Sequence, residues 1–66
     1  MQNAWPPPGY ESSIPPEIER KIAGMPLGQA LNHFFLLHAR LVLIGENLAE
    51  NEMQEYFLLK KRMLLL

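Results

Sequence analysis

Few side chains in this 66-residue chain have the chemistry of catalytic groups, and their spacing does not predict a catalytic site. The chain has no cysteine, which excludes disulfides, thiolate nucleophiles and thiolate metal sites. Ser12 and Ser13 lie in a proline-rich segment that contains no histidine. Four acidic residues gather near a predicted turn and are interpreted as a solvated acidic loop: Glu46, Glu50, Glu52 and Glu55. Acid–base catalysis needs carboxyl groups in a cleft with unlike environments, so we expect that the protein is not an enzyme.

The two histidines do not form a metal-binding pair. His33 and His38 are five positions apart, which places them roughly 140° apart around an α-helix. Histidines that bind one metal from the same helix are three or four positions apart. We therefore expect no metal and no cofactor. His38 lies between two apolar stripes, so we expect it to hydrogen-bond a neighbouring side chain, whereas His33 lies on the most polar face and is expected to be solvated.

The charge balance argues against nucleic acid as a partner. Six Lys and Arg residues stand against seven Asp and Glu residues, and the net charge is −1. No basic surface is therefore available to neutralise a row of phosphates. The absence of cysteine is compatible with a cytoplasmic location or another reducing compartment.

No membrane-spanning helix is predicted, because the longest uncharged stretch, residues 22–39, contains a proline and several polar residues. Residues 60–66 combine three basic side chains with methionine and leucines. Three charges are few for binding to anionic lipid, so a membrane surface is not expected as a partner. We interpret the segment as charge that stabilises a helix C-terminus, with its apolar residues packing near Leu31 and Phe35.

The N-terminal segment is rich in proline and carries two aromatic residues. Its prolines predict an extended polyproline conformation that ends in a turn at Gly9. The run Pro7-Pro8-Gly9-Tyr10 resembles the Pro-Pro-x-Tyr ligand of WW domains, in which a preformed polyproline helix presents a tyrosine. Two alternatives remain: Trp5 and Tyr10 fold back as anchors on the helices, or the segment wraps around a partner protein.

Three helices are predicted after this segment. A short helix begins at Pro16, which suits a first helical position, and stops at Gly24. A longer helix begins near Leu27 and carries an apolar stripe with alternating spacings of four and three: Ala30, Phe34, Leu37, Leu41, Ile44 and Leu48. A third helix begins near Asn51, which forms a capping-box pattern with Gln54.

The turn between the two longer helices has more than one possible position. Gly45 with Asn47 would give two helices of similar length. The apolar stripe continues past Gly45, which favours a turn nearer Glu50 and Asn51. A single long helix from Leu27 onward is a further alternative.

The fold class is therefore all-α, with an extended proline-rich arm over residues 1–15 and a helical domain over residues 16–66. The short helix is followed by an antiparallel helical hairpin. A chain of this size buries a small core, and apolar side chains remain in surplus: Leu36, Leu43, Leu58 and Leu65. Association is expected to cover them, as a homodimer that completes a four-helix bundle or by docking on a larger protein.

These features predict a small non-enzymatic protein-binding module, such as a regulator, an inhibitor or an adaptor. The alternative is a small structural subunit that holds neighbouring proteins together in a large assembly. The candidate partner-binding residues are two sets, the arm residues Trp5, Pro7, Pro8 and Tyr10 and the outward-facing helix residues Leu36, Arg40 and Leu43.

Overall fold

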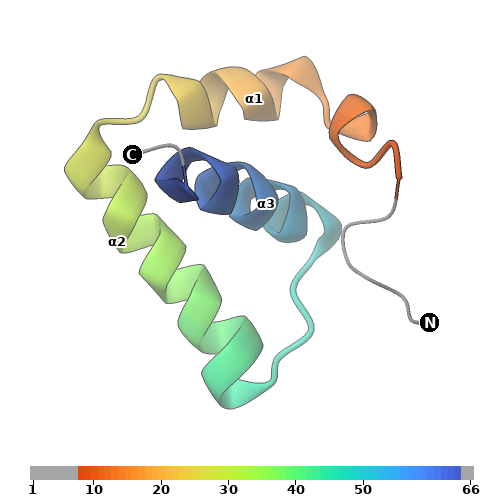
Figure 1. Ribbon diagram of the computed structural model, residues 1–66. Helices are drawn as coiled ribbons and strands as arrows, with labels where there is room; N and C mark the ends of the chain where they lie inside the picture. The colour runs from red at the N-terminus through yellow and green to blue at the C-terminus, as the bar shows by residue number, and fades with distance from the viewer. Residues whose placement is uncertain (1–7, 65–66) are drawn as a thin grey trace.

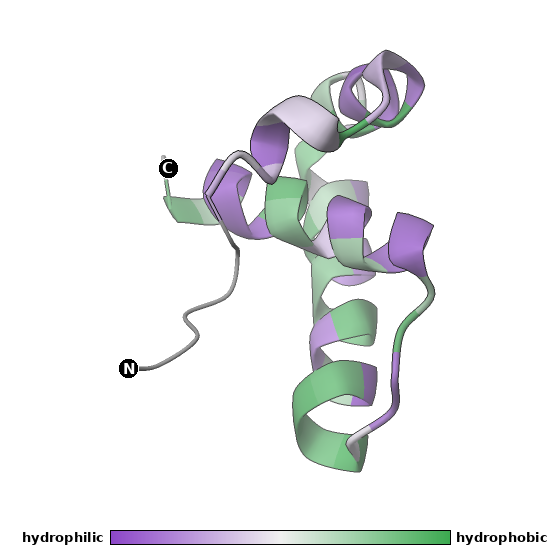
Figure 2. Ribbon diagram, turned by 90° about the vertical axis from the view of Figure 1, so that its right-hand side faces the viewer, coloured by the Kyte–Doolittle hydropathy of each residue, from purple (hydrophilic) through white to green (hydrophobic). Residues whose placement is uncertain are grey.

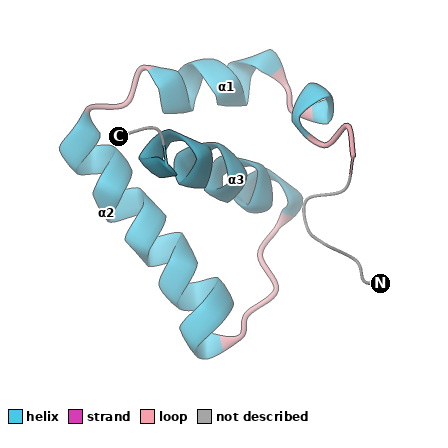
Figure 3. Ribbon diagram, in the orientation of Figure 1, coloured by secondary structure: helices cyan, strands magenta, loops and turns pink. Residues whose placement is uncertain are grey.

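The computed structural model describes residues 8–64 and contains helices and no strands over that range (Figure 1, Figure 3). The predicted all-α class is confirmed. In chain order the elements are the 3-10 helix η1 (Glu11–Ser13), the α-helices α1 (Pro16–Ala23) and α2 (Leu27–His38), the π-helix η2 (Ala39–Ile44), and the α-helix α3 (Glu50–Leu64).

The described part of the N-terminal segment is a turn followed by η1. Gly9 has a φ of 79°, so the predicted turn at this glycine is confirmed. The chain after it is not extended, because the hydroxyls of Ser12 and Ser13 donate hydrogen bonds to the carbonyls of Gly9 and Tyr10, at 2.9 and 2.6 Å. Ile14, which follows η1, is buried. The predicted polyproline stretch at residues 5–7 lies outside the described residues.

Helix α1 has the predicted bounds. Pro16 occupies the first helical position, where its missing N–H costs no hydrogen bond. The helix ends at Gly24, whose N–H donates to the carbonyl of Arg20 at 3.0 Å. The inner face of α1 places Ile22 in the core and Ile18 against it.

Helices α2 and α3 pack against each other and cross at a steep angle (Figure 2). Their contacts run in opposite order along the two helices, since His33 contacts Glu55 while Arg40, further along α2–η2, contacts Glu52. The turn lies at residues 45–49, so the favoured position near Glu50 and Asn51 was wrong. Gly45 adopts the left-handed conformation with a φ of 82°, which ends the helix there.

The start of α3 is capped two residues earlier than the sequence suggests. The carboxylate of Glu52 accepts a hydrogen bond from the N–H of Ala49 at 3.1 Å. This is the acidic half of a capping box with Ala49 as its first residue. The predicted capping box of Asn51 and Gln54 is therefore wrong. Gln54 is a buried residue of the first turns of α3.

The core lies where α1 and α2 both pack against α3 (Figure 1). Its buried members are Ile22, Met25, Ala30, Leu37, Tyr56 and Leu59. Leu58, expected in the apolar surplus, is partly buried against this core. The short helix α1 covers it, a contact that the sequence pattern of α3 alone did not reveal.

Replacement of Gly45 by alanine is expected to lower the free energy of unfolding by about 1–2 kcal/mol, because an L-residue is strained in the left-handed conformation. A Cβ at Gly45 would meet no atom within 4 Å, so crowding does not contribute. Denaturant unfolding measures the loss. Gly45→Asn is the control and should lose less, since asparagine tolerates this conformation. Equal losses for both variants would contradict the backbone explanation.

Candidate functional site

Apolar residues occupy much of the ribbon of α2 and η2 (Figure 2). Of the seven large apolar residues that are exposed in the described part of the chain, six lie on α2 and η2, and the seventh is Leu64 of α3. We call the six residues on α2 and η2 the outer face. Its members, with their exposed fractions, are Leu27 (44%), Phe35 (60%), Leu36 (58%), Val42 (56%), Leu43 (77%) and Ile44 (67%). Single exposed apolar residues are ordinary on soluble proteins, whereas several of them on one helical segment make that segment a candidate interaction surface.

The outer face exists because α3 covers only the opposite side of α2. Ala30 and Leu37 point toward α3 and are 0% and 2% exposed. A helix that is apolar around most of its circumference needs neighbours on more than one side. Leu36 and Leu43 were predicted to face outward, and both are exposed in the structure.

The π-helix η2 widens the outer face at its C-terminal end. Its hydrogen bonds run from residue i to i+5, so each turn holds more residues than a regular α-turn. Three consecutive residues, Val42, Leu43 and Ile44, are exposed as a result. Ile44 was expected in the inner stripe, and that prediction was wrong because the wider turn rotates it away from α3.

Arg40, predicted as a partner-binding residue with Leu36 and Leu43, pairs with two carboxylates of its own chain, and its role in binding stays a prediction. Its guanidinium Nε donates to Glu46 Oε1 at 2.9 Å, and its Nη1 donates to Glu52 Oε2 at 2.7 Å. The hydrogen bond from Arg40, with a second from the Ala49 N–H, holds the pKa of Glu52 below its ordinary value. Arg40 thus joins η2 to the loop and to the start of α3, which fixes the end of the outer face.

Glu55 is buried at the meeting point of three helices. Its residue is 5% exposed, and its carboxylate accepts a hydrogen bond from Lys21 Nζ of α1 at 2.8 Å. Its other oxygen lies 2.7 Å from His33 Nε2 of α2. Burial alone would raise the pKa of Glu55, but the hydrogen bonds with Lys21 and His33 outweigh burial and lower it.

The predictions of a solvated His33 and a solvated Glu55 are therefore wrong. A signal for Glu55 was present in the sequence, because it precedes the core residue Leu59 by four positions and so lies on the same side of α3. No comparable local signal identified its partners, which lie 22 and 34 positions away.

His38 has the hydrogen-bonded environment that was predicted for it. Its Nδ1 shares a hydrogen bond of 3.0 Å with the hydroxyl of Tyr56. The ring of Phe34 stacks on Tyr56 with a centroid distance of 5.4 Å and lies 5.7 Å from the His38 ring. These aromatic side chains fix the inner side of α2 against α3.

Two of the four predicted arm residues, Pro8 and Tyr10, lie within the described part of the chain. Tyr10 packs edge-on against Phe57, with ring centroids 5.3 Å apart. Pro8 is exposed. Trp5 and Pro7 lie outside the described residues, so their proposed contacts stay predictions.

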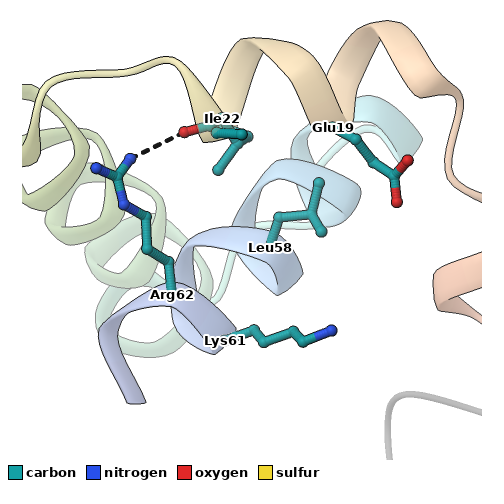
Figure 4. A pocket seen from close by; sticks show the side chains of 6 residues that line it. Glu19, Ile22, Leu58, Lys61 and Arg62 are labelled. Atoms are coloured by element: carbon teal, nitrogen blue, oxygen red, sulfur yellow. Dashed lines mark hydrogen bonds between the residues drawn. The ribbon is translucent and has the colours of Figure 1, made fainter. Parts of the chain in front are cut away.

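The basic residues near the C-terminus hold α1 and η1 in place. Lys61 pairs with Glu11, and Arg62 Nη1 donates to the carbonyl of Ile22 at 2.9 Å (Figure 4). Leu64 was expected to pack near Phe35, but it is 78% exposed.

An open pocket of about 300 Å³ lies between α1 and α3 beside Lys61 and Arg62. Both cations already have partners, and the carboxylate of Glu19 also lines the pocket.

Two further findings concern metals and membranes. Over residues 8–64, no group of three His, Asp or Glu side chains is arranged to hold a metal. The stretch Leu27–Ile44 is long and apolar enough to cross a membrane by length and composition, and 11% of it is buried. The uncharged stretch considered above, residues 22–39, includes Pro26. Leu27–Ile44 begins after that proline and contains one charged residue, Arg40.

Searches of protein-family models, curated proteins and solved structures find no match to this chain. A functional assignment therefore rests on the surfaces described above.

Acid is expected to destabilise the protein through Glu55. A carboxyl whose pKa is lowered by folding stabilises the native state above its ordinary value of 4.5, and this stabilisation is lost as the pH falls through the lower native pKa. Glu55→Gln should therefore lower the free energy of unfolding at pH 7 by about 1–3 kcal/mol and weaken its acid dependence. Unfolding curves between pH 7 and pH 3 test this, with the exposed Glu17→Gln as control. An unchanged pH profile in Glu55→Gln would contradict the assigned role.

Arg40→Lys is expected to loosen the end of η2, although it keeps the positive charge. A lysine ammonium cannot reproduce the fork of hydrogen bonds to Glu46 and Glu52. Hydrogen exchange of the Glu46 amide, which donates to the carbonyl of residue 40 at 2.8 Å, should become faster. The exposed Arg20→Lys is the matched control, and equal protection in both variants would show that the guanidinium contacts are dispensable.

Proposed function

We propose that this chain is a small non-enzymatic protein-binding module, of the regulator, inhibitor or adaptor type, that docks through the outer face of α2 and η2. The observation that carries the proposal is the contiguous exposure of Phe35, Leu36 and Val42–Ile44 on a helix whose opposite side is buried. Burial of such a surface against a partner is the main source of affinity in helix-in-groove recognition.

The surroundings of the outer face support docking as a preformed unit. The aromatic contacts of Phe34 and His38 hold the inner side of α2 on α3. Arg40 holds the other end through Glu46 and Glu52. A surface that is ordered before binding loses little conformational entropy when the partner docks.

A permanent subunit of a larger assembly is the second candidate. Permanently bound interfaces are larger and more apolar than transient ones. Six large apolar residues are exposed on α2 and η2, with the exposed Asn32 among them in the sequence. The two candidates differ in how the chain behaves when made alone. A regulator should be soluble and folded, whereas an obligate subunit should aggregate or unfold without its neighbours.

Photo-crosslinking from the outer face tests the proposal. A photoreactive p-benzoyl-phenylalanine in place of Leu43 should give protein adducts in the cells that make the chain. The same residue in place of Leu64 is the matched control, because Leu64 is as exposed as Leu43 but lies on α3. We expect several-fold more protein adducts from position 43. Lipid adducts alone from position 43, or equal protein adducts from both positions, would contradict docking of a protein on the outer face.

A further inference from the structure

The two ends of the outer face differ in the size of the side chains that they present. Near the N-terminus of α2, a Cβ added to Gly28 would meet no atom within 4 Å, so the surface is open there. At the other end, Leu43 is the most exposed residue of the outer face. The two ends therefore differ in shape, and one is suited to receive a side chain that the other presents.

We propose that the outer face binds a second copy of this chain in an antiparallel arrangement, with Leu43 of each copy over Gly28 of the other. The inference rests on the proposed function and names its partner. With a two-fold axis between Phe35 and Leu36, these two residues face each other across the axis. Asn32 then lies opposite Ala39, so in the two outer pairs a larger side chain meets a smaller one, while the two large side chains meet at the axis.

The distribution of charge favours this occupant. No Asp, Glu, Lys or Arg occurs from residue 27 to residue 39, so two copies can meet without repulsion between like charges. The nearest charge, Arg40, is already paired with Glu46 and Glu52. An antiparallel arrangement also brings the N-terminus of each α2 near the C-terminal end of the other, where the helix dipoles attract.

A parallel arrangement of the same face fits less well. It would place Gly28 opposite Gly28, which leaves a void, and Leu43 opposite Leu43, which crowds the broad end. Voids and crowding both weaken a packed interface. The shape of the outer face therefore distinguishes the two orientations.

The exposed area is of the size that a dimer needs. Taking roughly 200 Å² for a fully exposed large apolar residue, the exposed fractions of the outer face amount to roughly 700 Å². A standard interface buries about 800 Å² on each partner. In this dimer, the two α2 helices pack back to back, and each carries its own α1 and α3 on the far side.

A size exchange across the interface tests the proposal. Gly28→Leu removes a poor helix former and meets no atom of its own chain, so helicity should be retained or raised. It should nevertheless weaken self-association by roughly 100-fold, because the new side chain fills the space that the partner's Leu43 occupies. The double variant Gly28→Leu with Leu43→Ala should recover most of the association. Light scattering over a range of concentrations, with circular dichroism on the same samples, measures both properties.

Single cysteines test the orientation, since the chain has none of its own. Asn32→Cys mixed with Ala39→Cys should give a cross-linked dimer with a short bismaleimide. Either variant alone should give little. Strong cross-linking within each variant alone would overturn the antiparallel arrangement.

The combined outcomes separate this inference from the proposed function. A chain that stays monomeric at every concentration overturns the dimer, while photo-adducts to another protein from position 43 keep the proposed function. A monomer without protein adducts overturns both. A dimer that Gly28→Leu leaves intact would place the contact elsewhere and overturn the inference.

Discussion

The buried carboxylate of Glu55 is the interaction on which the rest of the structure depends. It is contributed by α3 and receives Lys21 from α1 and His33 from α2, so one side chain joins all three α-helices. A carboxylate removed from water is costly unless it is paired, and each helix must therefore keep its position to satisfy it. The apolar core around Leu59 supplies burial, while Glu55 selects which arrangement of the helices is adopted.

The exposed surface follows from this arrangement. Since α1 and α2 both use α3 as their neighbour, α2 has one covered side and one open side. Over residues 8–64, no other helix packs on the open side. The outer face is thus the side of α2 and η2 that the described helices leave uncovered, and the proposed function is based on it.

Much of the local structure was predictable from the sequence. Pro16 and Gly24 mark the bounds of α1, and the exposure of Leu36 and Leu43 follows from their position opposite the inner stripe of α2. The hydrogen bond of His38 was also predictable, because the residue lies at the edge of that stripe. Each of these features depends on a few neighbouring residues of known periodicity.

The errors concern features that depend on distant parts of the chain. Glu55 and His33 were taken as solvated because their partners come from other helices. The ion pairs of Arg40 were not foreseen, because Glu46 and Glu52 come near it only once the chain has turned at Gly45. The π-helix has no pattern of its own in the sequence, so the apolar stripe was extended through it as if the helix were regular.

The π-helix has an evolutionary consequence for such a protein. Loss of one residue between Leu41 and Ile44 would remove the wide turn and rotate the last exposed side chains by about 100° around the helix. The buried core residues of α2, Ala30 and Leu37, lie before this point, whereas Leu48, which packs against the core, follows it. A single deletion or insertion in η2 would thereby change which side chains are presented to a partner, while the sequences of α1, α2 and α3 stay the same.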